Sequence, residues 1–85
     1  RVKLNLLTKT NEIVEHDYHK DSESSDALTS ILYLNTNNGY TRFKDKKIKS
    51  EANTLITFPS ATFHSGTTCT DEGFRLVLNI VYKAF

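Results

Sequence analysis

Residues 74–82 read FRLVLNIVY, a run of bulky and β-branched apolar residues with one charge and one amide. Alternate side chains of a strand point to opposite faces. One face would then carry Arg75, Val77, Asn79 and Val81, and the other Phe74, Leu76, Leu78, Ile80 and Tyr82. If the fully apolar face is the core, Arg75 points to solvent. If both faces are covered, Arg75 lies inside and needs an anionic partner, because an unpaired buried charge is very costly.

Residues 27–35 repeat this pattern. Their two predicted faces both look at least partly buried: Ala27, Thr29, Ile31, Tyr33 and Asn35 on one, Leu28, Ser30, Leu32 and Leu34 on the other. Outward from these two stretches, alternation and β-branched residues predict strands near 2–8, 12–19, 27–35, 40–43, 46–49, 54–58, 61–68 and 74–83. Asn37–Gly39 predicts a hairpin turn with positive φ, and Asp71–Gly73 a second turn. About eight short strands in so short a chain predict an all-β sandwich or barrel.

Length and composition limit the remaining possibilities. A chain of 85 residues forms one domain, and a net charge of +1 gives no electrostatic reason to expect nucleic-acid or membrane binding. The single cysteine excludes an internal disulfide, so we expect a cytoplasmic protein; Cys69 itself is expected to be a small strand or loop residue. The chain contains no Met, which we interpret as a C-terminal fragment of a longer protein, although tag removal would look the same. The basic run 44–47 predicts a solvated hairpin rather than a binding patch.

Three side chains could hold a metal ion. His19 and Asp21 are two positions apart, so on a strand they would point the same way, and an antiparallel arrangement could bring His64 beside them. Two imidazoles and one carboxylate form the facial triad of non-haem Fe(II) oxygenases. The alternatives are a surface histidine, a loop aspartate and a buried, hydrogen-bonded His64. If the triad exists, its ligand atoms should lie within about 4 Å of one another, because each ligand bond is roughly 2 Å.

Arg75 favours the metal-site interpretation, because a fork-shaped guanidinium on an inward strand face suits a bound dicarboxylate. His16 lies three residues before His19 and would face the other way on a strand, so we interpret it as structural or solvent-facing.

In these motifs the chain resembles the catalytic core of 2-oxoglutarate- and Fe(II)-dependent oxygenases, and more narrowly their prolyl-hydroxylase-like branch with its bacterial and phage members. The motifs that carry the resemblance follow the family's order along nearly the whole chain: His19-Lys20-Asp21, Ile31–Asn35, Asn38–Phe43, Phe58-Pro59-Ser60 leading to His64, and Arg75. The resemblance implies an all-β fold with a double-stranded β-helix (jelly-roll, cupin-like) core, and a single catalytic-core domain over residues 1–85.

The resemblance also assigns roles by position. His19, Asp21 and His64 would ligate iron, and Arg75 would pair with the distal carboxylate of 2-oxoglutarate. Tyr33 would contact the same carboxylate, or else be a core aromatic. Thr29 and Val77 would line the pocket, whereas Asn5 would either add a polar group or be an edge-strand amide.

The implied activity is a hydroxylase, a dioxygenase that uses Fe(II), 2-oxoglutarate and O2, with ascorbate as an additional cofactor that the resemblance allows. It would decarboxylate 2-oxoglutarate to succinate while hydroxylating a protein residue, such as a prolyl residue, or a small molecule. Nucleic-acid substrates are not expected, because position 81 is Val where the repair relatives tend to carry a second arginine.

The chain departs from the family pattern because it lacks the usual N-terminal helical region. The apolar outer faces of 27–35 and 74–82 would then be left in water, so a homodimer through this sheet is one expected partner arrangement. Two other functions remain open: a non-catalytic jelly-roll module for binding or assembly, and a cupin-type metalloprotein with another co-substrate. Arg75 discriminates the oxygenase from both of them, since neither needs a carboxylate clamp.

Overall fold

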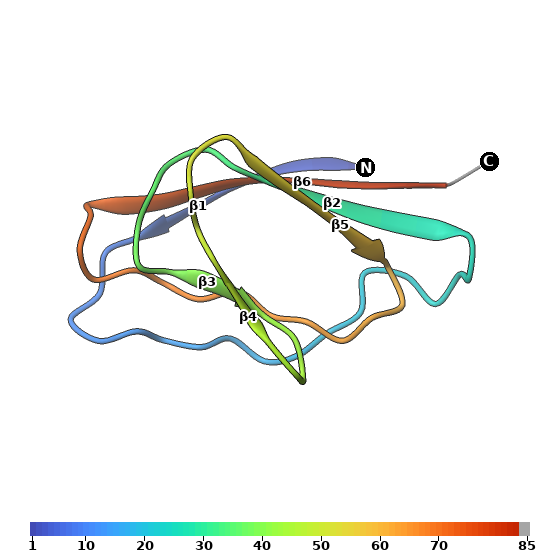
Figure 1. Cartoon of the computed structure of the whole chain (residues 1–85), viewed down its shortest axis with the longest axis horizontal. Coiled ribbons are helices and arrows are strands. Elements are labelled where there is room, and N and C mark those ends of the chain that lie inside the picture. Colours follow the sequence, from blue (N-terminus) through green and yellow to red (C-terminus); the bar gives the residue numbers. More distant parts are fainter. Residues whose placement is uncertain (84–85) are drawn as a thin grey trace.

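The computed structural model describes residues 1–83, which form six β-strands and no helix (Figure 1). The strands are β1 (Val2–Thr8), β2 (Ala27–Tyr33), β3 (Tyr40–Arg42), β4 (Lys47–Lys49), β5 (Thr54–Pro59) and β6 (Phe74–Lys83). Within this part of the chain no helix is long and apolar enough to cross a membrane. The all-β prediction is confirmed.

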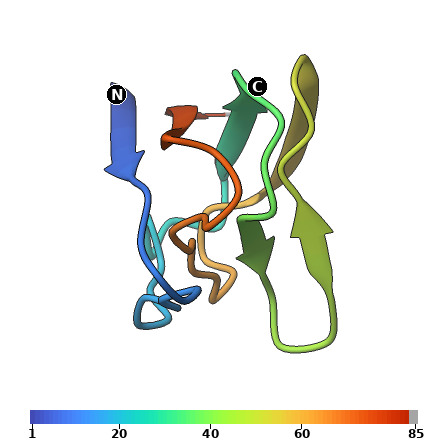
Figure 2. The same cartoon turned by 90° about the vertical axis from the view of Figure 1, so that its left-hand side faces the viewer.

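The strands form two layers. One is a four-stranded antiparallel sheet in the order β1-β6-β2-β5, and the other contains the antiparallel pair β3–β4. Figure 1 shows the larger sheet above, with β3, β4 and the long connecting segments below it, and Figure 2 shows the same layers from the side. Isolated bridges extend the lower layer beyond β3, joining Arg42 to Ser65, His19 to His64 and Glu15 to Thr67.

The strands predicted near 12–19 and 61–68 are wrong as regular strands. These two segments do lie side by side, but they meet only at isolated bridges. Threonine hydroxyl groups accept some of the hydrogen bonds that backbone carbonyls accept in a regular ladder. The hydroxyl oxygen of Thr68 accepts one from the Val14 amide at 2.9 Å. In the same way the Tyr40 amide donates to Thr67 Oγ1 at 3.0 Å. Because a side-chain oxygen replaces a backbone carbonyl at these points, regular pairing cannot propagate.

The predicted hairpin turn at Asn37–Gly39 is also wrong. The segment connects β2 in one layer to β3 in the other, and Gly39 does not have a positive φ. Among residues 1–83 the one non-glycine residue with positive φ is Asn53, at 66°, between β4 and β5. Asparagine tolerates this left-handed conformation better than most residues. The reason for a glycine at position 39 lies in its contact with β6, described below.

The core lies between the two layers. The buried apolar cluster comprises Ile31, Tyr33, Phe43, Phe58 and Val77, with Ile48 and Ile56 packed against it. Arg75 shares the inward face of β6 with Val77 and is only 2% exposed. Of the two alternatives for strand 74–82, the arginine therefore follows the one that places it inside, although the opposite face is not fully covered as that alternative required.

The outward face of the larger sheet is apolar and only partly covered. Phe74 and Tyr82 on β6 are 45% and 40% exposed, and Leu4 on β1 and Leu55 on β5 are 59% and 57% exposed. The inner and outer faces therefore differ sharply in packing, although both are rich in apolar residues.

Replacing Phe58 by Ala tests this division of the sheet. Phe58 lies in the core on β5, and removing a buried phenylalanine ring costs about 3–5 kcal/mol through lost burial and the cavity left behind. The control is Leu55→Ala on the same strand, where 57% exposure limits the loss to less than about 1 kcal/mol. Urea unfolding measures both values, and equal losses would contradict the assignment of the inner face.

Candidate metal centre

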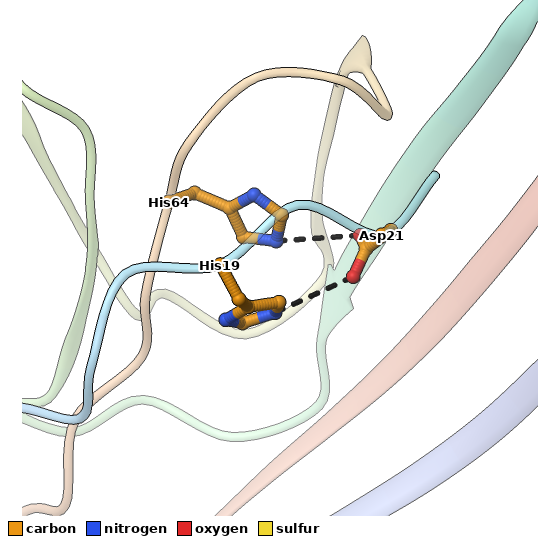
Figure 3. Close-up of side chains that lie close together, drawn as sticks. All are labelled: His19, Asp21 and His64. Carbon is orange, nitrogen blue, oxygen red and sulfur yellow. Dashed lines mark ion pairs between the residues drawn. The ribbon is translucent and has the colours of Figure 1, made fainter. Parts of the chain in front are cut away.

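His19, Asp21 and His64 converge on one point at the edge of the sandwich, as Figure 3 shows. Nε2 of His19 lies 3.4 Å from Asp21 Oδ1, and Nε2 of His64 lies 3.3 Å from Asp21 Oδ2. One ligand atom from each residue can be chosen so that all three lie within 4.8 Å of one another. This is looser than the expected 4 Å. Two ligands of one ion at roughly 2.0–2.2 Å can be at most about 4.4 Å apart, so sharing an ion requires a small inward movement.

The backbone brings the three side chains together. His19 and His64 form an antiparallel bridge, in which each amide donates to the other residue's carbonyl at 2.9 and 3.0 Å. The Asp21 amide donates to the Ser60 carbonyl at 3.0 Å, which holds the carboxylate next to the bridge. The predicted proximity of His19 and Asp21 thus arises from an isolated bridge and a following loop rather than from a regular strand.

Neighbouring polar groups orient two of the three side chains. His64 Nδ1 lies 2.8 Å from the Thr62 carbonyl, which can only accept, so this nitrogen donates and Nε2 is the ring nitrogen that faces Asp21. The Thr29 hydroxyl donates to Asp21 Oδ2 at 2.7 Å. Hydrogen bonds of this kind, between a metal-binding side chain and a neighbouring protein group, fix the orientation of the ligands in metal sites.

The three side chains differ in solvent exposure and therefore in how far they can move. The side chain of His64 is 5% exposed and packs edge-on against Phe58, with ring centroids 4.7 Å apart. The side chain of Asp21 is 10% exposed, whereas that of His19 is 54% exposed. His19 is therefore the residue that can move to close the site.

A cavity of about 340 Å³ opens beside the triad and runs along the inward face of β6. It is lined by the triad and, from β6, by Arg75, Val77 and Asn79. Arg1 and Lys3 also line it, and within residues 1–83 Asp21 is the one carboxylate in the lining. The charge of the cavity wall therefore favours an anionic ligand.

Arg75 lies in this cavity without a counter-ion. Its Nε is buried and has no hydrogen-bond partner, and no carboxylate of the described residues forms an ion pair with it. Burial lowers the pKa of the guanidinium below its usual value, because little nearby charge compensates for the lost water. The anionic partner that a buried arginine requires is therefore not supplied by this part of the chain.

Gly39 gives Arg75 its space. A Cβ placed at position 39 would lie 2.5 Å from Arg75 Cδ and 2.8 Å from its Nε. It would also lie 2.7 Å from Asn37 Oδ1. Real Cβ atoms essentially never show such distances, so a larger residue would displace the Arg75 side chain, the Asn37 side chain or both. The local sequence around Gly39 predicts a turn and carries no signal for this contact with Arg75.

The other predicted residues lie around the cavity in different positions. Val77 and Asn5 line it. Tyr33 is fully buried, with its ring 5.8 Å from the Arg75 guanidinium and its hydroxyl donating to Thr41 Oγ1 at 2.7 Å. Burial raises the pKa of the Tyr33 hydroxyl. Thr29, predicted to line the pocket, is not among the cavity-lining residues; its hydroxyl instead contacts Asp21.

Four further residues differ in how well the sequence predicted their positions. Asn79 and Thr41 line the cavity but were not predicted, and Asn79 Oδ1 is buried without a hydrogen-bond partner. The signal for Asn79 was its position on the same strand face as Arg75. His16 is exposed, as expected, but it lines the same cavity as His19 instead of facing away from it. Cys69 is a buried loop residue, in line with its expectation.

Comparison with known proteins adds evidence on the fold. No protein-family model matches the chain, and no curated protein matches it. Among solved structures, a cupin-2 domain containing protein from Shewanella frigidimarina NCIMB 400 superposes with a TM-score of 0.65 at 13% sequence identity. The match covers 98% of this chain and 69% of that one. The predicted jelly-roll, cupin-like core is therefore confirmed as a fold.

Replacing Gly39 by Ala tests the packing around Arg75. The added methyl group collides with the buried guanidinium stem, and overpacking of this kind costs about 1–3 kcal/mol. The control is Gly73→Ala, where a Cβ meets nothing within 4 Å and φ is not positive. Thermal unfolding compares the two variants. A Gly39 variant as stable as the Gly73 variant would show that Arg75 is not held in this position.

Proposed function

We propose that the protein is a 2-oxoglutarate- and Fe(II)-dependent oxygenase that hydroxylates a protein residue or a small molecule. The observation that carries the proposal is Arg75: a buried guanidinium without a counter-ion, lining the same cavity as two histidines and an aspartate. A group that binds a dicarboxylate and a group that binds a metal ion are both needed for this reaction, and they need to face one space.

The donor set fits Fe(II). His19, Asp21 and His64 offer two imidazole nitrogens and a carboxylate, the combination that leaves adjacent positions open in non-haem iron oxygenases. When bound, the iron supplies the activation of O2 and the oxidative decarboxylation of the co-substrate to succinate. The protein's part is to fix His64 through Thr62 and Asp21 through Thr29.

The cavity wall would orient the co-substrate. Arg75 would pair through its two-pronged guanidinium with the distal carboxylate, which removes the cost of its unpaired burial. Tyr33 lies beside Arg75 and would reach the same carboxylate by exchanging its bond to Thr41. Val77, only 4% exposed, excludes water from this part of the wall.

A second candidate is a cupin-type metalloprotein with another co-substrate, which the cupin-2 structural neighbour favours. It shares the fold and the triad but leaves the buried Arg75 unexplained unless its co-substrate is also anionic. A non-catalytic module would leave both the triad and Arg75 without a role.

Removing the aspartate tests the metal site. We expect Asp21→Ala to weaken binding of Co²⁺ or Zn²⁺ at least about 100-fold, because the site loses its one carboxylate. Asp17→Ala is the matched control, since Asp17 lies on the same segment but outside the triad. Isothermal titration calorimetry measures both. Equal affinities in the two variants would remove Asp21 from the site.

Replacing Arg75 tests the co-substrate. Arg75→Lys keeps the charge but loses the two-pronged contact, so 2-oxoglutarate binding weakens yet survives. Arg75→Leu removes both, and the affinity should fall on the order of 100-fold or more, given roughly 1.5–3 kcal/mol for each charge-assisted hydrogen bond. Metal affinity should change little, because Arg75 is not in the triad.

The measurement is anaerobic titration of the Fe(II)-loaded protein with 2-oxoglutarate, following the metal-to-ligand absorption band. Turnover of 2-oxoglutarate by the same protein across candidate substrates distinguishes the oxygenase from the second candidate. Unchanged 2-oxoglutarate affinity in the Leu variant would reject Arg75 as the clamp.

A further inference from the structure

A second cavity, of about 410 Å³, lies on the other side of the wall behind His64. It opens between the edge strands β4 and β5, whose side chains line it; among the described strands β4 pairs with β3 alone and β5 with β2 alone. Its lining is dominated by apolar side chains, namely Phe43, Ile48, Ile56, Phe58 and Phe63. We refer to these five residues and the space between them as the seam groove.

Lysine ammonium groups surround the seam groove. Lys44 and Lys46 both line it, and their ammonium groups lie over aromatic rings: Lys44 is 5.2 Å from the centroid of Phe63, and Lys46 is 5.7 Å from that of Phe43. Lys20 approaches the Phe63 ring at 4.8 Å. Cation–π contacts of this kind hold flexible lysine side chains near an apolar surface.

Within residues 1–83, no carboxylate neutralises the two lining lysines. No carboxylate of residues 1–83 forms an ion pair with Lys44 or Lys46, whereas the neighbouring Lys47 approaches Glu15 at 3.9 Å and Lys20 approaches Glu23 at 3.7 Å. Asp45 is the one acidic residue in the described lining of the groove. The rim is therefore positive beside a strongly apolar floor.

From this combination we infer that the seam groove binds an amphiphilic monocarboxylate, with an apolar body of about ten carbons on the phenylalanine and isoleucine side chains and its carboxylate between Lys44 and Lys46. A cavity of this size lies at the small end of the usual range for ligand pockets, which suits a ligand of about 10 to 15 non-hydrogen atoms. The sequence predicts that the basic run 44–47 is a solvated hairpin rather than a binding patch. In this proposal its Lys44 and Lys46 bind the carboxylate.

The proposal is independent of the metal site. The seam groove shares no lining residue with the cavity that holds Arg75, so a ligand that binds here does not need the triad. The two cavities contact opposite sides of one wall, because the Phe58 ring that floors the groove packs against His64.

The test is titration of the ¹⁵N-labelled chain with decanoate, followed by amide chemical shifts. Two probes separate the two halves of the ligand: 1-decanol keeps the apolar body without the charge, and butyrate keeps the charge without the body. We expect saturable shifts at Phe43, Ile48, Ile56 and Thr62 with decanoate, and at least 10-fold weaker binding of either probe.

Surface variants locate the site without disturbing the core. The double variant Lys44→Glu/Lys46→Glu should weaken decanoate binding at least 10-fold, while Lys9→Glu/Lys49→Glu, on exposed lysines outside the groove, leaves it unchanged within 2-fold. Phe63→Ala should weaken it at least 5-fold, compared with Phe74→Ala on the outer sheet; the two rings are 41% and 45% exposed.

Three results would overturn the inference. One is the absence of saturable shifts at millimolar decanoate. Another is shifts that map to the outward sheet face around Leu4 and Leu55, in which case Phe74→Ala and not Phe63→Ala weakens binding. The third is shifts along Arg75 and Val77 that vanish in Arg75→Leu, which would place the carboxylate in the other cavity and would leave the proposed function untouched.

Discussion

Arg75 places a guanidinium in the interior of the sandwich, and the surrounding structure is arranged around this buried charge. Its strand pairs on both sides, with β1 and β2, so the arginine cannot swing to an edge. Gly39 leaves out a side chain to make room for it, and the Tyr33 ring lies against it. A buried cation costs free energy unless an anion compensates for it. The fold thus maintains a site whose stability improves when an anion enters the cavity.

The bridge between His19 and His64 is the second constraint. Like the bridge between Glu15 and Thr67, it joins the segment after β1 to the segment before β6, and both amides of the His19–His64 pair are satisfied there. The two histidines differ in freedom, because His64 is held between Thr62 and Phe58 while His19 is half-exposed. A site with two fixed ligands and one mobile ligand can admit an ion and then close on it, at little cost in ordering.

The sequence predicts the strands and the residues that share a strand face wherever the period-2 pattern of side chains determines them. Alternation predicts strand 74–83 and places Arg75 and Val77 on the same face, but it does not decide whether that face lies inside. The place of both residues in one pocket is implied by the family resemblance, and both line the cavity. Prediction was wrong where single side chains intervene. The hydroxyls of Thr67 and Thr68 interrupt the ladders of 12–19 and 61–68, and Gly39 serves a contact 36 positions away in the chain rather than a local turn. Neither effect has a periodic signal, since each depends on which segments the tertiary fold brings together.

Alternation on β6 also gives the two faces of the larger sheet different characters. Inward positions carry Arg75 and Asn79, the two buried polar groups that lack a hydrogen-bond partner in the described chain. Outward positions are apolar from Phe74 to Tyr82, and they continue onto Leu4 of β1 at the register partner Leu78. Successive side chains of a strand point to opposite faces. The identities of the outward residues therefore depend on the surroundings of this sheet face, whereas those of the inward residues depend on the cavity. The same strand therefore meets two independent requirements, one on its outward face and one on its inward face. Native interiors rarely leave buried polar groups unpaired, so the unsatisfied groups of the inward face point to a ligand rather than to a packing defect.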